Sequence, residues 1–210
     1  MGPSRPERQA TRRATTGDHY FSESPTVGSR PTRVVVDVRG LRFGLETDRG
    51  TFSPTRLDLG TAFLIGSAPD PPATGRFLDL GCGYGPLACA LATLAPDAEV
   101  VATDINRRSR ALCAANAAAL GLDNVVAAAP DEVEGGFDLV WSNPPIRIGK
   151  PALHALLVEW LGRLTPGGEA VLVVNRHLGA DSLQRWLTDQ GLPTERLASK
   201  KGYRLLRATR

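Results

Sequence analysis

The chain has 210 residues, of which 42% are hydrophobic and 22% are charged, and its formal net charge is +3. This length suits one well-cored domain. No apolar run approaches the roughly 18 residues that span a bilayer, so we expect no transmembrane helix. The basic N-terminus lacks the apolar core of a secretory signal, so we expect no signal peptide. The three cysteines are too few and too scattered for a disulfide framework or a zinc site, and we expect a reduced, cytoplasmic protein without a bound metal.

The first third of the chain is predicted to hold a disordered tail, a hairpin and a helix. Residues 1–17 are rich in Pro, Arg, Thr and Ser and have no apolar periodicity, which is typical of disorder. Two β-prone runs on either side of Arg39-Gly40 predict a β-hairpin over about residues 32–46. Apolar residues then recur at helical spacing from Leu57 to Ile65. We expect residues 18–210 to form a single domain.

From Arg76 onward, short apolar runs alternate with helical patterns. The expected strands cover residues 77–80, 99–103, 124–128, 137–141, 169–174, 194–198 and 203–208, and the expected helices cover residues 86–94, 106–120, 152–164 and 182–190. Alternation of this kind predicts an α/β fold with a parallel sheet covered by helices on both faces. The last two strands flank a basic turn and are expected to form an antiparallel hairpin.

A glycine-rich segment, residues 79–86, follows the first of these strands and opens a helix, which is the context of a cofactor loop. Its G-x-G-x-G spacing differs from the G-x-G-x-x-G loop that binds the pyrophosphate of a dinucleotide. S-adenosylmethionine has no phosphate, and Asp79 suits its ammonium group, so the loop favours this cofactor over a nicotinamide dinucleotide. The loop residues expected to bind it are Asp79, Gly81, Cys82, Gly83 and Gly85.

Two acidic positions after the next strands are further candidates for cofactor binding. Asp104 ends the second strand of the alternating region, where a carboxylate can accept both ribose hydroxyls. Ile105 is expected to pack on the adenine face. The alternative for Asp104 is an N-cap of the helix that begins at Asn106. Asp131, after the third strand, is the nearest candidate for the adenine amine, and a solvated loop acid is the equally open alternative.

The motif Asn143-Pro144-Pro145-Ile146 follows the fourth strand, at the edge of the sheet where ligands bind. The two prolines fix two φ angles and remove two donors, which would leave the Pro144 carbonyl free to point outward. The Asn143 side chain offers a second acceptor oxygen. Two acceptors can hold both hydrogens of one exocyclic NH₂ group and aim its nitrogen lone pair at a methyl donor. The alternative is a rigid strand-to-loop turn.

These segments together resemble the methyltransferase small-domain family, most closely its small-subunit ribosomal RNA guanine-N2 methyltransferases. The resemblance also covers residues 50–53, 57–61 and 201–205. It implies a Rossmann-like class I methyltransferase fold, a seven-stranded sheet with a reversed last strand. It further implies that Asp79, Gly81, Gly83, Asp104 and Asn143 face the cofactor, that residues 143–146 face the target amine, and that Phe52 and Ser53 belong to the pocket.

The choice of substrate depends on one position in the motif. Adenine-N6 and glutamine-N5 methyltransferases usually carry an aromatic residue after the two prolines, whereas this sequence carries Ile146. That difference favours guanine-N2 methylation of ribosomal RNA on a flipped base. A protein glutamine-N5 or small-molecule amine methyltransferase stays open as an alternative, and so does a noncatalytic RNA-binding module.

Basic side chains near the motif and in the C-terminal turn are candidates for contacts with RNA phosphates. A solvated surface charge is the equally open alternative for each of them. We expect a monomer or a weak homodimer. The residues concerned are Arg147, Lys150, Lys200, Lys201 and Arg204.

Overall fold

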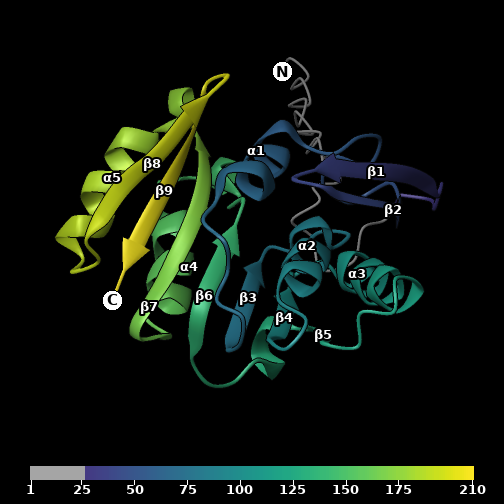
Figure 1. The fold of residues 1–210 in the computed structure, drawn as a ribbon. Helices are drawn as coiled ribbons and strands as arrows, with labels where there is room; N and C mark the ends of the chain where they lie inside the picture. The colour runs from purple at the N-terminus through teal and green to yellow at the C-terminus, as the bar shows by residue number, and fades with distance from the viewer. Residues whose placement is uncertain (1–26) are drawn as a thin grey trace, which may run out of the picture.

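The computed structural model describes residues 27–210 (Figure 1). The tail predicted to be disordered, residues 1–17, lies outside the described residues, as do the first residues of the expected domain. Within the described part of the chain, no helix is long and apolar enough to cross a membrane.

A two-stranded hairpin, β1 (Thr32–Val38) and β2 (Leu41–Thr47), stands apart from the main sheet. Its two turn residues have positive φ, 57° at Arg39 and 76° at Gly40, as a type I′ turn requires. Val34, Val36 and Leu45 point from the hairpin into the core and are almost completely buried. The expected hairpin is therefore confirmed. Apolar and polar residues alternate along its strands, so that the apolar side chains face the core.

Seven strands form the main sheet in the order β5-β4-β3-β6-β7-β9-β8. The pairs among β3 to β7 are parallel, whereas β9 runs antiparallel to both β7 and β8, so the expected sheet with a reversed last strand is confirmed. The strands are β3 Arg76–Leu80, β4 Glu99–Thr103, β5 Val125–Ala128, β6 Phe137–Ser142, β7 Leu164–Asn175, β8 Thr194–Lys200 and β9 Tyr203–Thr209.

Helices cover both faces of this sheet (Figure 1). The first apolar cluster joins α1, α2, α3 and the hairpin to one face, and the second joins α4 and α5 to the other. The molecule is thus a three-layer sandwich with the sheet in the middle. The helices are α1 Leu59–Ser67, α2 Pro86–Leu94, α3 Arg107–Ala119, α4 Lys150–Leu161 and α5 Ala180–Asp189.

Helix α4 differs most from the expectation, which was a helix over residues 152–164. It begins two residues earlier because Pro151 is accepted in a first turn, where its missing N–H has no partner to lose. It ends at Leu161, with Gly162 as its C-cap. Leu164 has already joined β7 and pairs with Phe137 of β6. Sheet pairing therefore outweighs the helical pattern at this end.

Polar side chains in α3 and at its N-cap tie the hairpin layer to the glycine-rich loop. The Asn116 amide donates to the carbonyls of Glu46 and Tyr84, each at 2.8 Å, and its oxygen accepts the Glu46 N–H at 2.8 Å. The Asn106 amide donates to the Gly50 carbonyl at 2.7 Å. These bonds hold the segment after β2 beside the carboxyl ends of the parallel strands.

Candidate active site

A cavity of about 860 Å³ opens at the carboxyl ends of β3, β4, β6 and β7. Strand order reverses between β3 and β6, and this switch point is where ligands bind in open α/β sheets. The segment after β2 and the start of α1 close the cavity from the other side. The wall includes Phe52, Ser53, Asp58, Thr61, Gly81, Cys82, Gly83, Asp104, Ile105, Pro130, Asn143, Pro144, Pro145, Ile146, Arg147, Asn175, Leu178 and Tyr203.

The glycine-rich loop offers an open backbone surface to this cavity. Gly81 and Gly83 have positive φ, 81° and 55°, and a Cβ placed on either would meet no atom of the described residues within 4 Å beyond its chain neighbours. The N–H groups of Gly81 and Cys82 both donate to the Thr103 carbonyl at 2.9 Å, which fastens the loop to the end of β4. A ligand can therefore approach the loop backbone closely at these glycines.

Gly85, the third glycine, does not line the cavity. It is the N-cap of α2 with φ 94°, and a Cβ there would lie 2.7 Å from the Cys113 Sγ. Its hydrogen therefore allows α2 to pack against α3. Direct contact of Gly85 with a cofactor stays a prediction.

Asp79 lies behind the loop, outside the cavity wall. Its side chain is completely buried, and Oδ2 accepts the Ala88 N–H of the first turn of α2 at 2.9 Å. Oδ1 has no hydrogen-bond partner among the described residues. Burial is the main cause that raises the pKa of Asp79 to about 8; the Ala88 N–H opposes this shift and the charge of the neighbouring Asp104 adds to it. The carboxyl group thus supports the loop, and its contact with a cofactor stays a prediction.

Asp104 faces the cavity with a carboxylate held by backbone donors. Oδ2 accepts the Gly83 N–H at 3.0 Å and Oδ1 accepts the Asn106 N–H at 2.8 Å. Burial raises the pKa of Asp104, and these two bonds oppose that shift. Each carboxylate oxygen still has a lone pair for a hydroxyl group. Beside it, Ile105 is 52% exposed and presents an apolar side chain to the same space.

The N-cap alternative for Asp104 is wrong. The N-cap of α3 is Asn106, whose side-chain oxygen accepts the N–H groups of Arg108 and Ser109 at 2.9 and 3.3 Å. The third-strand candidate, Asp131, is exposed in a 3-10 turn over Pro130–Glu132, and Pro130 reaches the cavity wall in its place. Binding of the adenine amine by Asp131 stays a prediction.

Asn143, at the end of β6, has its side-chain amide oriented by α1. The Asn143 Nδ2 donates to the Asp58 Oδ2 at 2.9 Å and to the Thr61 hydroxyl at 3.1 Å. A carboxylate only accepts, so the nitrogen of the amide must face Asp58. The amide oxygen of Asn143 therefore points away from α1 and has no hydrogen-bond partner within the described chain. This oxygen is an oriented acceptor at the cavity wall.

Asp58 holds this arrangement because it also caps α1. Its Oδ2 accepts the Thr61 N–H at 2.9 Å, the usual N-cap bond. Gly60 lies two residues after Asp58, in the first turn of α1. A Cβ at Gly60 would lie 2.9 Å from both the Asp58 Oδ2 and the Tyr203 ring. Glycine at this position lets the carboxylate and the ring approach each other. Neither Asp58 nor Tyr203 was predicted as a site residue from motif chemistry.

The Pro144 carbonyl differs from the expectation that it is free. It accepts the Ile146 N–H at 2.8 Å in an inverse γ-turn, with Pro145 at its apex (φ −74°, ψ 70°). The prediction overlooked that a short i to i+2 bond closes this turn. A carbonyl oxygen has two lone pairs, so the Pro144 oxygen keeps one acceptor position. The turn fixes its direction more firmly than the proline rings alone.

The basic residues proposed to contact RNA separate into three places. Arg147 lines the large cavity, whereas Lys150 is exposed at the start of α4 and lines neither this cavity nor the smaller one at the β8–β9 turn. A second cavity of about 230 Å³ lies at the β8–β9 turn. It is lined by Arg176, Ser199, Lys200, Lys201, Gly202, Tyr203 and Arg204.

The chain is similar in sequence and in fold to known proteins. A family model described as methyltransferase small domain matches residues 42–207. The "Uncharacterized protein YbxB" of Bacillus subtilis is 33% identical over 196 residues, which cover 91% of this chain and 98% of that protein. A solved structure of the Thermus thermophilus 16S rRNA N2 G1207 methyltransferase RsmC, in complex with AdoMet and guanosine, matches with a TM-score of 0.72 and 25% identity. That match covers 89% of this chain and 52% of that protein.

Other relatives are longer than this chain. The ribosomal RNA small subunit methyltransferase C of Shewanella loihica is 36% identical over 135 residues, which cover 61% of this chain and 39% of that protein. The corresponding enzyme of Salmonella choleraesuis is 36% identical, with 41% of its length covered. This chain therefore spans about two fifths of the length of these relatives.

The buried carboxyl group of Asp79 predicts a pH-dependent stability. The folded protein keeps a proton on Asp79 up to pH of about 8, whereas the unfolded chain releases it near the ordinary carboxyl pKa. The free energy of unfolding should therefore fall as the pH rises from about 4 to about 8 and change little from this group above that. Asp79→Asn keeps an acceptor for the Ala88 N–H and removes the titrating carboxyl group. The free energy of unfolding of this variant should therefore fall less steeply with rising pH.

Urea denaturation at pH 5, 6, 7 and 8 measures these slopes. The control is Asp97→Asn, which removes an exposed carboxylate and should keep the wild-type slope. Equal slopes in Asp79→Asn and the wild type would contradict the assignment.

Proposed function

Because the chain belongs to the methyltransferase small domain family, we propose that it transfers a methyl group from S-adenosylmethionine to the exocyclic N2 amine of a guanine in ribosomal RNA. The observation that carries this proposal is the oriented amide of Asn143. Its oxygen is turned toward the cavity by Asp58 and Thr61, and it stands next to the Pro144 carbonyl in the motif.

The cavity fits S-adenosylmethionine on three observations. Gly81 and Gly83 leave an open backbone wall that a side chain would fill. Asp104 presents two carboxylate oxygens with spare lone pairs, as the two ribose hydroxyls need. Ile105 adds an exposed apolar surface beside that carboxylate, suited to one face of the adenine. When bound, this cofactor supplies an electrophilic methyl group on a sulfonium ion.

The acceptor motif explains how a weak nucleophile is activated. The nitrogen lone pair of an aromatic amine is delocalised into the ring, so the planar group attacks poorly. The Asn143 oxygen and the Pro144 oxygen together accept both hydrogens of the amine, which favours a tetrahedral nitrogen with an exposed lone pair. Positioning and preorganised dipoles then lower the barrier. The nitrogen becomes cationic as it attacks, and its proton leaves afterwards without a strong base.

The charge of Asp58 strengthens this arrangement. Its carboxylate accepts a hydrogen bond from Asn143 Nδ2, which polarises the amide and makes its oxygen a better acceptor. The positive charge that develops on the target nitrogen is then stabilised through Asn143 by an anion that does not touch the substrate. Asp58 is a positioning residue in this scheme, since it acts through Asn143.

Guanine is favoured over the other planar amines by the residue after the two prolines. Ile146 lines the cavity and packs on a base without the stacking of an aromatic ring. The Thermus thermophilus relative is described in complex with guanosine, which agrees with this choice. We further propose that ribosomal RNA is the partner, that residues 18–210 act as a single domain, and that the protein works in the cytoplasm as a monomer or a weak homodimer.

Methyl transfer from labelled S-adenosylmethionine tests the proposed function. The acceptors are ribosomal RNA, small ribosomal subunits, free glutamine and total cell protein, and the methylated product is identified by mass spectrometry. We expect N2-methylguanosine from the RNA samples. Label in protein glutamine or in a small amine, with none in RNA, would replace the proposal by a different acceptor. Cofactor binding with no turnover on any acceptor would indicate a noncatalytic module.

Substitution of Asn143 and Asp104 should separate chemistry from cofactor binding. Asn143→Ala removes one acceptor in the transition state and should lower kcat by about 10²–10³-fold. Asp104→Ala should mainly weaken cofactor affinity. The measurements are the turnover rate and the cofactor Kd from calorimetry for both variants. Equal losses of cofactor affinity in the two variants would mean that Asn143 serves the fold or the cofactor and not the acceptor.

Asp58→Ala and Thr61→Val should separate helix capping from the orientation of Asn143. Asp58→Ala removes the cap and the amide's anionic partner, so stability should fall by about 1 kcal/mol and kcat by at least about tenfold. Thr61→Val keeps the backbone N–H that Asp58 caps and removes only the hydroxyl that Asn143 contacts, so kcat should fall with little change in stability. An unchanged kcat in both variants would rule out the positioning role.

A further inference from the structure

We propose that the cavity at the β8–β9 turn is a binding site for the backbone phosphate next to the target nucleotide. This inference rests on the proposed function and adds where the substrate backbone lies. We call the site the phosphate cradle, and its cationic members are Arg176, Lys200, Lys201 and Arg204.

The first support is the charge of the cradle. Its wall holds four cationic side chains and no acidic one. Arg204 forms an ion pair with Asp181 from outside the wall, whereas Lys200 and Lys201 make no ion pair with any residue that the structure describes. Lys200 and Lys201 are therefore neighbouring like charges without a counter-ion in the described chain, an arrangement that destabilises a folded protein and suits an anionic ligand. Ser199 adds a hydroxyl group to the same wall.

The second support is the side chain of Lys201, which stands at the first position of the β8–β9 turn. Its φ is 47°, in the left-handed region that favours glycine and asparagine, and Gly202 follows with φ 83°. Arg39 occupies the same turn position in the other hairpin, with φ 57°. There the guanidinium donates to the carbonyls of Ile65 and Ala68 at 3.1 and 3.0 Å and so caps α1. The Lys201 side chain, by contrast, makes no hydrogen bond or ion pair with the residues that the structure describes, so it is available to a ligand.

The third support is the connection between the cradle and the large cavity. Tyr203 lines both, so the two cavities adjoin at this residue. Tyr203 pairs with Asn175 at the carboxyl end of β7, and Asn175 also lines the large cavity. A base held against Asn143 would therefore have its own backbone on the side of Tyr203 where the cradle lies.

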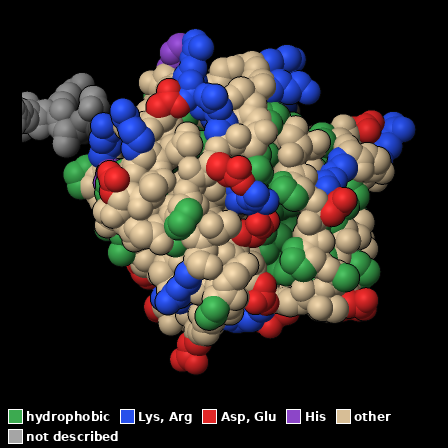
Figure 2. Space-filling model, turned by 60° about the vertical axis from the view of Figure 1, so that its left-hand side comes forward, with side chains coloured by type: hydrophobic (Ala, Val, Ile, Leu, Met, Phe, Trp, Pro, Cys, Tyr) green, Lys and Arg blue, Asp and Glu red, His purple; other side chains and the backbone are tan. Residues whose placement is uncertain are grey.

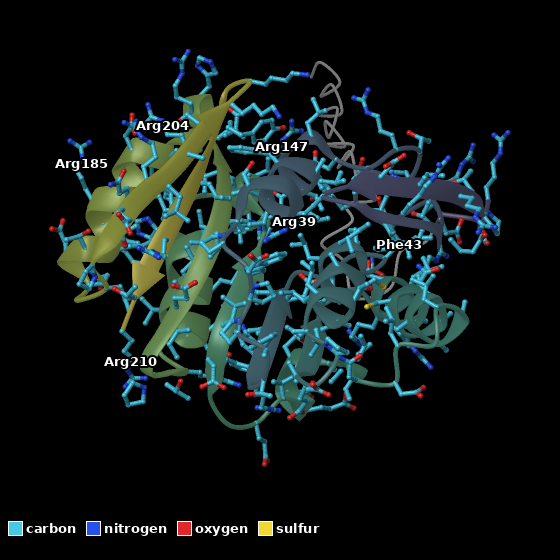
Figure 3. All side chains as sticks on the ribbon, in the orientation of Figure 1. Arg39, Phe43, Arg147, Arg185, Arg204 and Arg210 are labelled. Atoms are coloured by element: carbon cyan, nitrogen blue, oxygen red, sulfur yellow. The ribbon has the colours of Figure 1, made fainter. Side chains whose placement is uncertain are left out.

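Arg176 belongs to the cradle although it is far from the turn in sequence. It begins the short turn after β7, and its backbone N–H donates to the Gly202 carbonyl at 2.7 Å. That bond brings the Arg176 side chain beside Lys200 and Lys201. In Figure 2, Lys and Arg side chains gather at the upper end of the molecule, and Figure 3 places Arg204 and Arg147 at that end. Arg147 lines the large cavity, so cations stand on both sides of Tyr203.

Binding of guanine ligands with and without a phosphate tests the cradle. The ligands are guanosine, guanosine 5′-monophosphate and guanosine 3′-monophosphate, measured by calorimetry on the full chain. The wild type should bind one monophosphate about tenfold more tightly than guanosine, the size expected for charge-assisted contacts. The double variant Arg176→Gln with Lys201→Asn should bind guanosine normally and lose that preference.

Two comparisons make the result specific. Lys201→Asn alone should not lower the thermal unfolding temperature, because asparagine tolerates the left-handed conformation. The double variant Arg185→Gln with Arg196→Gln removes the same charge from exposed positions outside both cavities and should keep the preference. Figure 3 shows Arg185 pointing away from the sheet on the outer side of α5.

Affinity for a single-stranded RNA with one guanine gives an independent measure. The slope of log K against log salt should be smaller by about 0.7 for each phosphate contact that the cradle variant loses. If guanosine binds and neither monophosphate binds better, or if the cradle variant keeps the preference, the cradle is excluded while the proposed function stands. If no guanine ligand binds and a glutamine acceptor is methylated, the proposed function is wrong, and the phosphate cradle, which rests on it, is wrong as well.

Discussion

The hydrogen bond between the Asp58 carboxylate and the Asn143 amide is the contact on which the site depends. One carboxylate oxygen caps α1 through Thr61 and orients the Asn143 side chain of β6 at the same time. A single carboxylate oxygen therefore both caps α1 and orients the acceptor amide. Gly60 makes this possible, since any side chain there would push against the carboxylate or the Tyr203 ring.

The layers of the fold supply the rest of the site around that contact. The parallel strands deliver the glycine loop, Asp104 and the Asn143 motif to one edge, because their carboxyl ends share it. The hairpin contributes no group to the chemistry itself. It leads into the segment that contains Phe52 and Asp58. The Asn106 amide, at the N-cap of α3, holds this segment by a hydrogen bond to the Gly50 carbonyl. The reversed strand β9 then places Tyr203 opposite the end of β7, where the two cavities meet.

The two acids of this site, Asp79 and Asp104, differ in where their carboxyl groups lie relative to the cavity. Asp79 is sealed behind the loop with a raised pKa, whereas Asp104 faces the cavity with backbone donors on both oxygens. Asp79 lies in β3 and Asp104 directly follows the neighbouring strand β4, and burial is the largest cause of both pKa shifts. Asp79 thus supports the glycine-rich loop from behind, whereas Asp104 presents acceptor oxygens to the cavity.

The amino-acid sequence by itself determined the hairpin, the order of strands and helices, and the loop and motif residues, because turn glycines, apolar periodicity and fixed motif spacing are local properties. It misjudged the Pro144 carbonyl, since the closing bond to Ile146 depends on the turn adopted. Only the tertiary structure decided that Asp58 orients Asn143 across 85 residues, or that Arg176 joins the β8–β9 turn. Contacts of that kind arise from packing of whole layers, and no pattern within a short segment encodes them.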